Sequence, residues 1–170
     1  RLCMKAVYPG TFDPVTNGHV DIIERASSIF EEIIVTISHN VKKQCLFSLE
    51  ERLNMLTICA HKYPNVSVAI CEKLTAEFAR EMGAGAIIRG LRAVSDFEIE
   101  LKTALMNRHL NPDLETVFLM TREKYLFLNS SIIREVASFG GNIAEFVPTH
   151  VVESLRNKYN SLQGESTPPP

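Results

Sequence analysis

The residues between Pro9 and His19 have the types and spacing that bind an anion. Gly10 and Gly18 let a backbone approach a ligand closely, and His19 stands at the start of a segment with helical period. The first turn of a helix carries unpaired N–H groups and the positive end of the helix dipole, so a turn of this kind binds phosphate. A tight strand-to-helix connection with a capping histidine explains the same residues. On these residues alone both interpretations stay open.

Basic side chains follow two other apolar runs. Lys42 and Lys43 come after the second predicted strand, and Arg89 and Arg92 come directly after the fourth. Arginine binds phosphate through its planar fork of donors, and lysine binds it as a compact charge. The alternative is that these are ordinary solvated surface side chains.

The segment 125–131 has hydroxyl groups and backbone donors at the start of another predicted helix, with Arg134 one turn further on. Simple helix capping by Asn129 or Ser130 is the alternative. Positive or phosphate-suited groups thus follow several predicted strands, although the chain carries 18 basic and 20 acidic residues and a net charge of −2. Their concentration favours a site for small anions.

The elements that must position these residues alternate along the chain. Apolar and β-branched runs predict strands at Lys5 to Tyr8, Ile33 to Ile37, Val66 to Ile70, Ala86 to Ile88 and Thr116 to Met120. Segments with helical period lie between and after them, at about 20–30, 49–60, 76–82, 97–110, 131–138 and 149–160. Ser48 and Glu51 form a capping box at the second helix. On the fourth helix, the side chains expected to face inward are Phe97, Leu101, Ala104 and Leu105.

This alternation predicts an α/β fold: a single doubly wound domain with a five-stranded parallel sheet. Ligands of such sheets bind outside the carboxyl ends of the strands, where the residues above are expected. We expect residues 4–160 to form the domain. Residues 1–3 precede Met4, which reads as a natural start, and are expected to lie outside the fold. Residues 161–170 form a polar, proline-ended tail that is expected to be flexible and outside the fold as well.

The charge, the cysteine spacing and the lengths of the apolar runs argue against several classes of protein. The negative net charge and the absence of a long basic run argue against a nucleic-acid-binding protein. The four cysteines lack the spacing of a zinc site and are expected to be free thiols. The chain has neither an apolar run of membrane-spanning length nor a signal-peptide pattern, so we expect a cytoplasmic protein without a membrane partner.

Thr11, Phe12, Pro14, Gly18 and His19 resemble the TxFxPxxxGH signature of the nucleotidyltransferase superfamily. From Met4 to about Tyr159 the chain is similar to the bacterial pantetheine-phosphate adenylyltransferases. The resemblance implies a Rossmann-like nucleotidyltransferase fold that transfers AMP from ATP to 4'-phosphopantetheine, giving dephospho-coenzyme A and pyrophosphate in coenzyme A biosynthesis. It also implies Mg²⁺ bound with ATP, a homohexamer and possible feedback inhibition by coenzyme A.

The resemblance also implies roles for individual residues. Catalysis is expected from Thr11, His19, Lys43 and Arg92. The ATP site is expected to contain Thr11, Phe12, His19, Gly90, Leu91, Arg92, Glu100, Tyr125, Leu126, Phe127, Leu128, Asn129, Ser130 and Ser131. The phosphopantetheine site is expected to contain Thr11, Lys43, Thr75 and Arg89, and no residue is expected to bind a metal. Asn129, where the family often has serine, and Gln44, beside Lys43, depart from the family pattern.

Two other functions are alternatives to the pantetheine interpretation. Another nucleotidyltransferase, such as a nicotinate-mononucleotide adenylyltransferase or a cytidylyltransferase, would share the fold and the His19 motif. The segments 47–52 and 89–92 favour the pantetheine interpretation. A non-catalytic nucleotide-binding sensor would keep the phosphate-binding groups but would not need His19 and Lys43.

Overall fold

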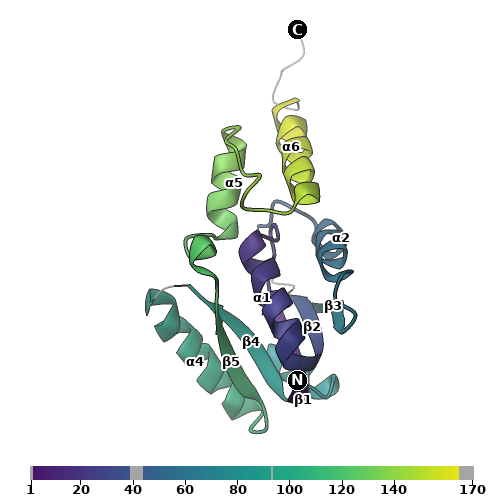
Figure 1. Ribbon diagram of the computed structural model, residues 1–170, viewed down its shortest axis with the longest axis vertical. Helices are drawn as coiled ribbons and strands as arrows, with labels where there is room; N and C mark the ends of the chain where they lie inside the picture. Colours follow the sequence, from purple (N-terminus) through teal and green to yellow (C-terminus); the bar gives the residue numbers. More distant parts are fainter. Residues whose placement is uncertain (1, 39–43, 93, 165–170) are drawn as a thin grey trace.

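The computed structural model describes residues 2–38, 44–92 and 94–164, and its helices and strands follow one another in the predicted order (Figure 1). The strands are β1 (Leu2–Gly10), β2 (Phe30–Ser38), β3 (Val66–Cys71), β4 (Ala86–Leu91) and β5 (Glu115–Met120). The helices are α1 (Asn17–Ile29), α2 (Leu49–Ala60), α3 (Thr75–Glu81), α4 (Val94–Leu110), α5 (Ser130–Ser138) and α6 (Thr149–Gly164), with a short 3₁₀ turn, η1 (Glu123–Tyr125).

The strands form one parallel sheet in the order β3-β2-β1-β4-β5. The expected doubly wound α/β fold with a five-stranded parallel sheet is confirmed. The chain builds outward from β1 through β2 to β3 and then crosses back to β4 on the other side of β1. The strand order reverses between β1 and β4, and a doubly wound sheet opens a crevice for ligands at the carboxyl ends of such a pair.

Apolar side chains bury both faces of the sheet. On one face Tyr8, Ile33 and Val35 belong to a core completed by α1, α2, α5 and α6. On the other, Val7, Ile34 and Ile87 pack with α3 and with Leu114. Strands covered on both faces carry nearly continuous apolar runs, which is why their positions could be read from the sequence. Figure 1 places α5 and α6 beyond the end of the sheet, so they extend the molecule above α1 and α2.

Hydrogen bonds from capping side chains mark where α2 and α5 begin. Ser48 accepts a hydrogen bond from the Glu51 backbone N–H, and the Glu51 carboxylate accepts one from the Ser48 N–H, so the predicted capping box at α2 is confirmed. At α5 the Asn129 side chain accepts from the Ile132 N–H at 2.8 Å. Asn129 therefore caps α5, as the alternative interpretation holds. The cap uses the side-chain oxygen of Asn129, the residue that departs from the family pattern.

Several element bounds differ from those expected. Strand β1 begins at Leu2, which pairs with Phe30 of β2, so Leu2 and Cys3 belong to the sheet and do not precede the fold. Phe30, expected in the first helix, begins β2 and is fully buried. Helix α6 continues to Gly164, past the expected end of the domain.

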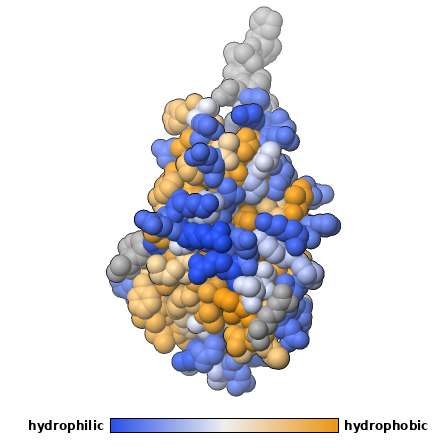
Figure 2. Space-filling model, viewed as in Figure 1, coloured by the Kyte–Doolittle hydropathy of each residue, from blue (hydrophilic) through white to orange (hydrophobic). Residues whose placement is uncertain are grey.

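The expectation of inward-facing apolar side chains on α4 is wrong for Phe97, Leu101 and Leu105, whereas Ala104 is half-buried. Phe97, Leu101 and Leu105 are 44%, 39% and 58% exposed. A helical stripe of apolar residues identifies a face that needs covering, but it does not say that this chain covers it. Apolar colours gather over the lower left of the face drawn in Figure 2, where Figure 1 places α4 and β5.

Candidate active site

A pocket of about 420 Å³ lies at the carboxyl ends of β1 and β4, at the point where the strand order reverses. Its size is ordinary for a small-molecule site. The β1–α1 connection, the first turn of α1, the end of β4, the residue after β5 and the start of α5 all contribute to its wall. The lining residues are Tyr8, Pro9, Gly10, Thr11, Phe12, Thr16, Gly18, His19, Ile22, Ser38, Arg89, Gly90, Arg92, Glu100, Thr121, Tyr125, Leu128, Asn129 and Ser130.

The β1–α1 loop folds back tightly at Phe12, which has a φ of +50°. A non-glycine residue in this left-handed region is uncommon and needs support from its surroundings. The ring of Phe12 is buried and packs edge-on against Tyr8 and His19, with centroid distances of 5.5 and 4.9 Å. A Cβ at Gly10 would lie 2.7 Å from this ring, so Gly10 provides the space that the turn needs.

His19 is the third residue of α1 and caps the helix. Its Nδ1 accepts a hydrogen bond from the Thr16 backbone N–H at 3.0 Å, and the Thr16 hydroxyl accepts one from the His19 N–H at 3.4 Å. The capping interpretation is therefore correct, but it does not exclude the anion-binding one. A backbone N–H can only donate, so Nδ1 carries a lone pair and the proton of the neutral ring is on Nε2.

The environment of His19 keeps its ring neutral. Burial, together with the smaller effect of the positive charge of Arg92, lowers the pKa of His19 from its ordinary 6.5 to about 4. At neutral pH the imidazole is thus an uncharged donor through Nε2. It lies in the pocket wall with one nitrogen held by the backbone, so a ligand oxygen can use the other.

The amino end of α1 opens on the same pocket. Its first turn contains no acidic side chain that would cancel the positive end of the helix dipole. The Asn17 N–H donates to the Phe146 carbonyl and the His19 N–H to Thr16, whereas the N–H of Gly18, which lines the pocket, has no acceptor among the described residues. This geometry suits a phosphate oxygen.

Charged side chains from β4 and α4 form the opposite wall. Arg89 and Glu100 make a bidentate ion pair, with Nε–Oε2 and Nη2–Oε1 distances of 2.5 and 2.7 Å. Hydrogen bonding to this carboxylate raises the pKa of Arg89 above its ordinary value. Arg92 donates through Nη1 to the Leu128 carbonyl at 2.7 Å, which ties the end of β4 to the segment before α5. Burial likewise raises the pKa of Tyr8 well above its ordinary 10, so its hydroxyl stays protonated.

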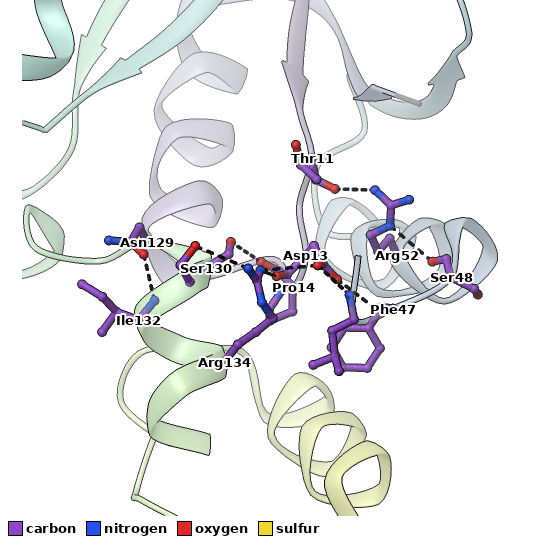
Figure 3. Close-up of polar contacts among 12 residues, drawn as sticks. Thr11, Asp13, Pro14, Phe47, Ser48, Arg52, Asn129, Ser130, Ile132 and Arg134 are labelled. Atoms are coloured by element: carbon purple, nitrogen blue, oxygen red, sulfur yellow. Dashed lines mark hydrogen bonds and ion pairs between the residues drawn. The ribbon is translucent and has the colours of Figure 1, made fainter. Parts of the chain in front are cut away.

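A second cavity of about 350 Å³ adjoins the first and shares Thr11 and Ser130 with it. Asp13, Gln44, Cys45, Ser131 and Arg134 complete its lining. Asp13 is only 3% exposed, and its carboxylate accepts from the Leu46 and Phe47 N–H groups at 2.9 Å each. Arg134 lies 3.4 Å from that carboxylate and also donates to the Asp13 carbonyl (Figure 3). The Ser130 hydroxyl donates to the Pro14 carbonyl at 2.8 Å.

Most of the residues expected in the site lie together in the first pocket. They are Thr11, Phe12, His19, Arg89, Gly90, Arg92, Glu100, Tyr125, Leu128, Asn129 and Ser130. Ser131 lines only the second cavity, while Leu91, Thr75, Leu126 and Phe127 line neither. Lys43 lies outside the described residues. Arg89, expected in the phosphopantetheine site, lines the same pocket as the expected ATP-site residues and is bonded to one of them, Glu100.

Sequence reasoning missed several members of the wall. Ser38 ends β2 and Thr121 follows β5, so the carboxyl-end rule used for the arginines would have found both. Tyr8 ends an apolar run, a pattern that predicts a strand residue and does not indicate that the side chain lines the pocket. Nothing in the local sequence singles out Asp13 or Arg52 as supports of the loop, since their partners are 33 to 41 positions away.

The described residues do not form a protein cage for a metal. No group of three or more His, Cys, Asp or Glu side chains lies together in the part of the chain that the structure describes. Glu100 is the one described carboxylate in the wall of the 420 Å³ pocket, and Arg89 engages both of its oxygens. This donor set does not fit a cation held by the protein alone. In the same part of the chain, no helix is both long enough and apolar enough to cross a membrane.

Comparisons with known proteins identify the family of this chain. Residues 7–136 match the cytidylyltransferase-like family. A phosphopantetheine adenylyltransferase of Desulforudis audaxviator is 52% identical over 160 residues, which is 94% of this chain and 98% of the relative. One of Alkaliphilus oremlandii is 54% identical over 154 residues, which is 91% of this chain and 98% of the relative.

A solved structure agrees in fold. A putative nicotinate-nucleotide adenylyltransferase from Vibrio parahaemolyticus aligns with a TM-score of 0.70, covering 93% of this chain and 96% of its own, at 16% identity. At that identity the likeness concerns the fold alone. The family match over most of the chain and the relatives near 50% identity identify the family, which the shared fold alone does not. The chain belongs to the cytidylyltransferase-like family and, within it, to the phosphopantetheine adenylyltransferases.

Proposed function

We propose that this enzyme transfers AMP from ATP to 4'-phosphopantetheine in the pocket at the carboxyl ends of β1 and β4. An ionised phosphate oxygen of phosphopantetheine forms a bond to the α-phosphorus, the bond from that phosphorus to the bridging oxygen breaks, and pyrophosphate leaves. The products are dephospho-coenzyme A and pyrophosphate. The nucleophile carries no proton at neutral pH, so the reaction needs positioning and charge stabilisation and no general base.

The observation that carries this proposal is the neutral imidazole of His19 beside the open amino end of α1. Negative charge grows on the α-phosphate oxygens during in-line attack, and donors fixed in advance stabilise it at little reorganisation cost. We assign the Nε2–H of His19 to these oxygens. The N–H groups of Phe12 and Gly18 would bind phosphate, and Arg92 would neutralise charge on the departing pyrophosphate.

Donors that the fold already holds in place would also bind 4'-phosphopantetheine, the second substrate. Arg89 keeps Nη1 available while Nε and Nη2 hold Glu100, so it can offer donors to the phosphopantetheine phosphate without losing its ion pair. Lys43 and Thr75 remain predicted members of that site, and inhibition by coenzyme A remains a prediction. Mg²⁺ would enter with ATP, coordinated by phosphate oxygens, because the carboxylates of the pocket do not supply a cage.

The decisive experiment is pyrophosphate release on mixing the purified protein with ATP, Mg²⁺ and 4'-phosphopantetheine, with dephospho-coenzyme A identified by mass spectrometry. Nicotinate mononucleotide serves as the competing acceptor. We expect release with phosphopantetheine and little with the mononucleotide. Binding of ATP without release with either acceptor would support a nucleotide sensor and refute the proposed reaction.

We also propose a homo-oligomer, in line with the hexamer implied by the resemblance. The support is the apolar side chains left exposed on α4 and β5: Phe97, Ile99, Leu101, Leu105, Met106 and Met120 are between 39% and 68% exposed. Apolar surface of this extent marks protein contacts. Light scattering should give a mass well above the 19.1 kDa of one chain, and a stable monomer at micromolar concentration would contradict the proposal. A reducing cytoplasm is the compartment we propose, since all four cysteines are free.

A further inference from the structure

Arg52 is a buried charge with an unusual set of partners. It lies on α2, is only 5% exposed, and makes no ion pair with any carboxylate among the described residues. Its Nη1 donates to the Thr11 carbonyl at 2.9 Å, and its Nε donates to the Ser48 carbonyl at 3.3 Å. Figure 3 shows the guanidinium reaching from α2 to the β1–α1 loop. Buried charges are ordinarily paired, so the position of this one needs an explanation.

The bond to Thr11 determines which way a neighbouring amide points. In a trans peptide the C=O of one residue and the N–H of the next point in opposite directions. Thr11 and Phe12 both line the 420 Å³ pocket, and Arg52 does not. The carbonyl held by Arg52 therefore points away from the pocket, and the Phe12 N–H points toward it. That N–H has no acceptor among the described residues.

The loop needs such a restraint because its conformation is not the one that the backbone prefers. Phe12 sits at a φ of +50°, where a non-glycine residue is strained. The carbonyls of Asp13 and Pro14 are held from α5 by Arg134 and Ser130, whereas among the described residues Arg52 alone donates to the carbonyl of Thr11. Without it, rotation of the Thr11–Phe12 peptide plane would relax the strain and turn the N–H out of the pocket.

We propose that Arg52 is a positioning residue for ATP: by holding the Thr11 carbonyl on the α2 side of the loop, it keeps the Phe12 N–H directed at the triphosphate. The inference rests on the proposed function, which puts ATP in this pocket. Arg52 also adds a buried positive charge that no carboxylate among the described residues neutralises, so its field favours an anion at the loop.

The test compares Arg52→Met and Arg52→Lys with Arg80→Met, measuring binding of ATP and of 4'-phosphopantetheine separately by calorimetry. Arg80 is a matched control because it also donates to a backbone carbonyl, that of Leu110, far from the pocket. Arg52→Met should raise the Kd for ATP at least tenfold, as for the loss of one hydrogen bond to an ionised acceptor, and change the Kd for phosphopantetheine less than threefold. Arg52→Lys should recover part of the ATP affinity, and Arg80→Met should change neither value.

The outcomes separate this role from a merely structural one. In steady-state assays Arg52→Met should raise KM for ATP much more than it lowers kcat. A folded Arg52→Met protein with unchanged ATP affinity, or with both affinities reduced equally, would overturn the proposal, as would failure of both Arg52 variants to fold. If the wild type binds ATP but releases no pyrophosphate, the proposed reaction fails, while the binding comparison still decides the role of Arg52.

Discussion

Replacement of His19 tests the proposed chemistry most directly, because the structure gives this side chain two separable tasks. Its Nδ1 caps α1 through the Thr16 N–H, and its Nε2–H is the donor assigned to the α-phosphate. His19→Ala removes both. The loss of a preorganised donor to a developing charge lowers kcat by roughly a hundredfold to a thousandfold. ATP affinity should change by less than about tenfold, since the contact gains strength only as charge develops.

The same variant should also be less stable, so stability alone does not identify the role of His19. Loss of a capping interaction costs about 0.5–2 kcal/mol, which lowers the melting temperature of a domain of this size by a few degrees. His19→Gln separates the tasks, because glutamine serves at the third position of a capping box and has no imidazole. We expect His19→Gln to melt near the wild type and still to turn over more slowly.

The second capping box of the molecule provides the matched control. Ser48→Ala removes the acceptor for the Glu51 N–H at α2 and leaves His19 intact. It should lose about 0.5–2 kcal/mol of stability while kcat stays near the wild-type value. Pyrophosphate release, ATP calorimetry and thermal melting are the three measurements. Near-normal turnover in a folded His19→Ala protein would refute the proposed mechanism, because the histidine would then act only as a cap.

Other predictions concern the remaining charged groups. The pKa of His19 is about 4 in the folded chain and 6.5 in the unfolded one, so the unfolded chain binds more protons between these values. The free energy of unfolding should therefore fall as the pH is lowered from 6.5 toward 4 and should not depend on His19 above pH 6.5. In urea unfolding, His19→Gln should lose the part of this fall that His19 causes. Lys43→Ala should weaken phosphopantetheine more than ATP, by roughly 1.5–3 kcal/mol for a lost charge-assisted contact; a larger loss for ATP by calorimetry would show that the loop is wrongly assigned. Glu100→Gln leaves the half-buried Arg89 without its carboxylate and should cost about 1–3 kcal/mol in urea unfolding; unchanged stability would mean that the ion pair contributes little.

Much of the fold followed from short-range patterns. The apolar runs predicted the strands because a parallel sheet covered on both faces needs nearly continuous apolar side chains. Ser48 and Glu51 marked the start of α2 correctly, since a capping box is completed within four residues. The element ends were less well placed: β1 begins earlier and α6 ends later than expected, and propensity says little about where pairing and packing stop.

The residues from Pro9 to His19 by themselves predicted a strand-to-helix turn that either binds an anion or is capped by histidine, because two glycines, a helix start and a histidine lie close together in the chain. Only the tertiary structure decided how that turn is held. Asp13 receives its hydrogen bonds from Leu46 and Phe47, and Thr11 receives its own from Arg52, between 33 and 41 positions away. The pairing of Arg89 with Glu100, and the exposure of Phe97 and Leu105 on α4, were likewise settled by packing. Local sequence specifies which groups a turn can offer, whereas the direction of each amide and the partner of each charge depend on segments that only the folded chain brings together.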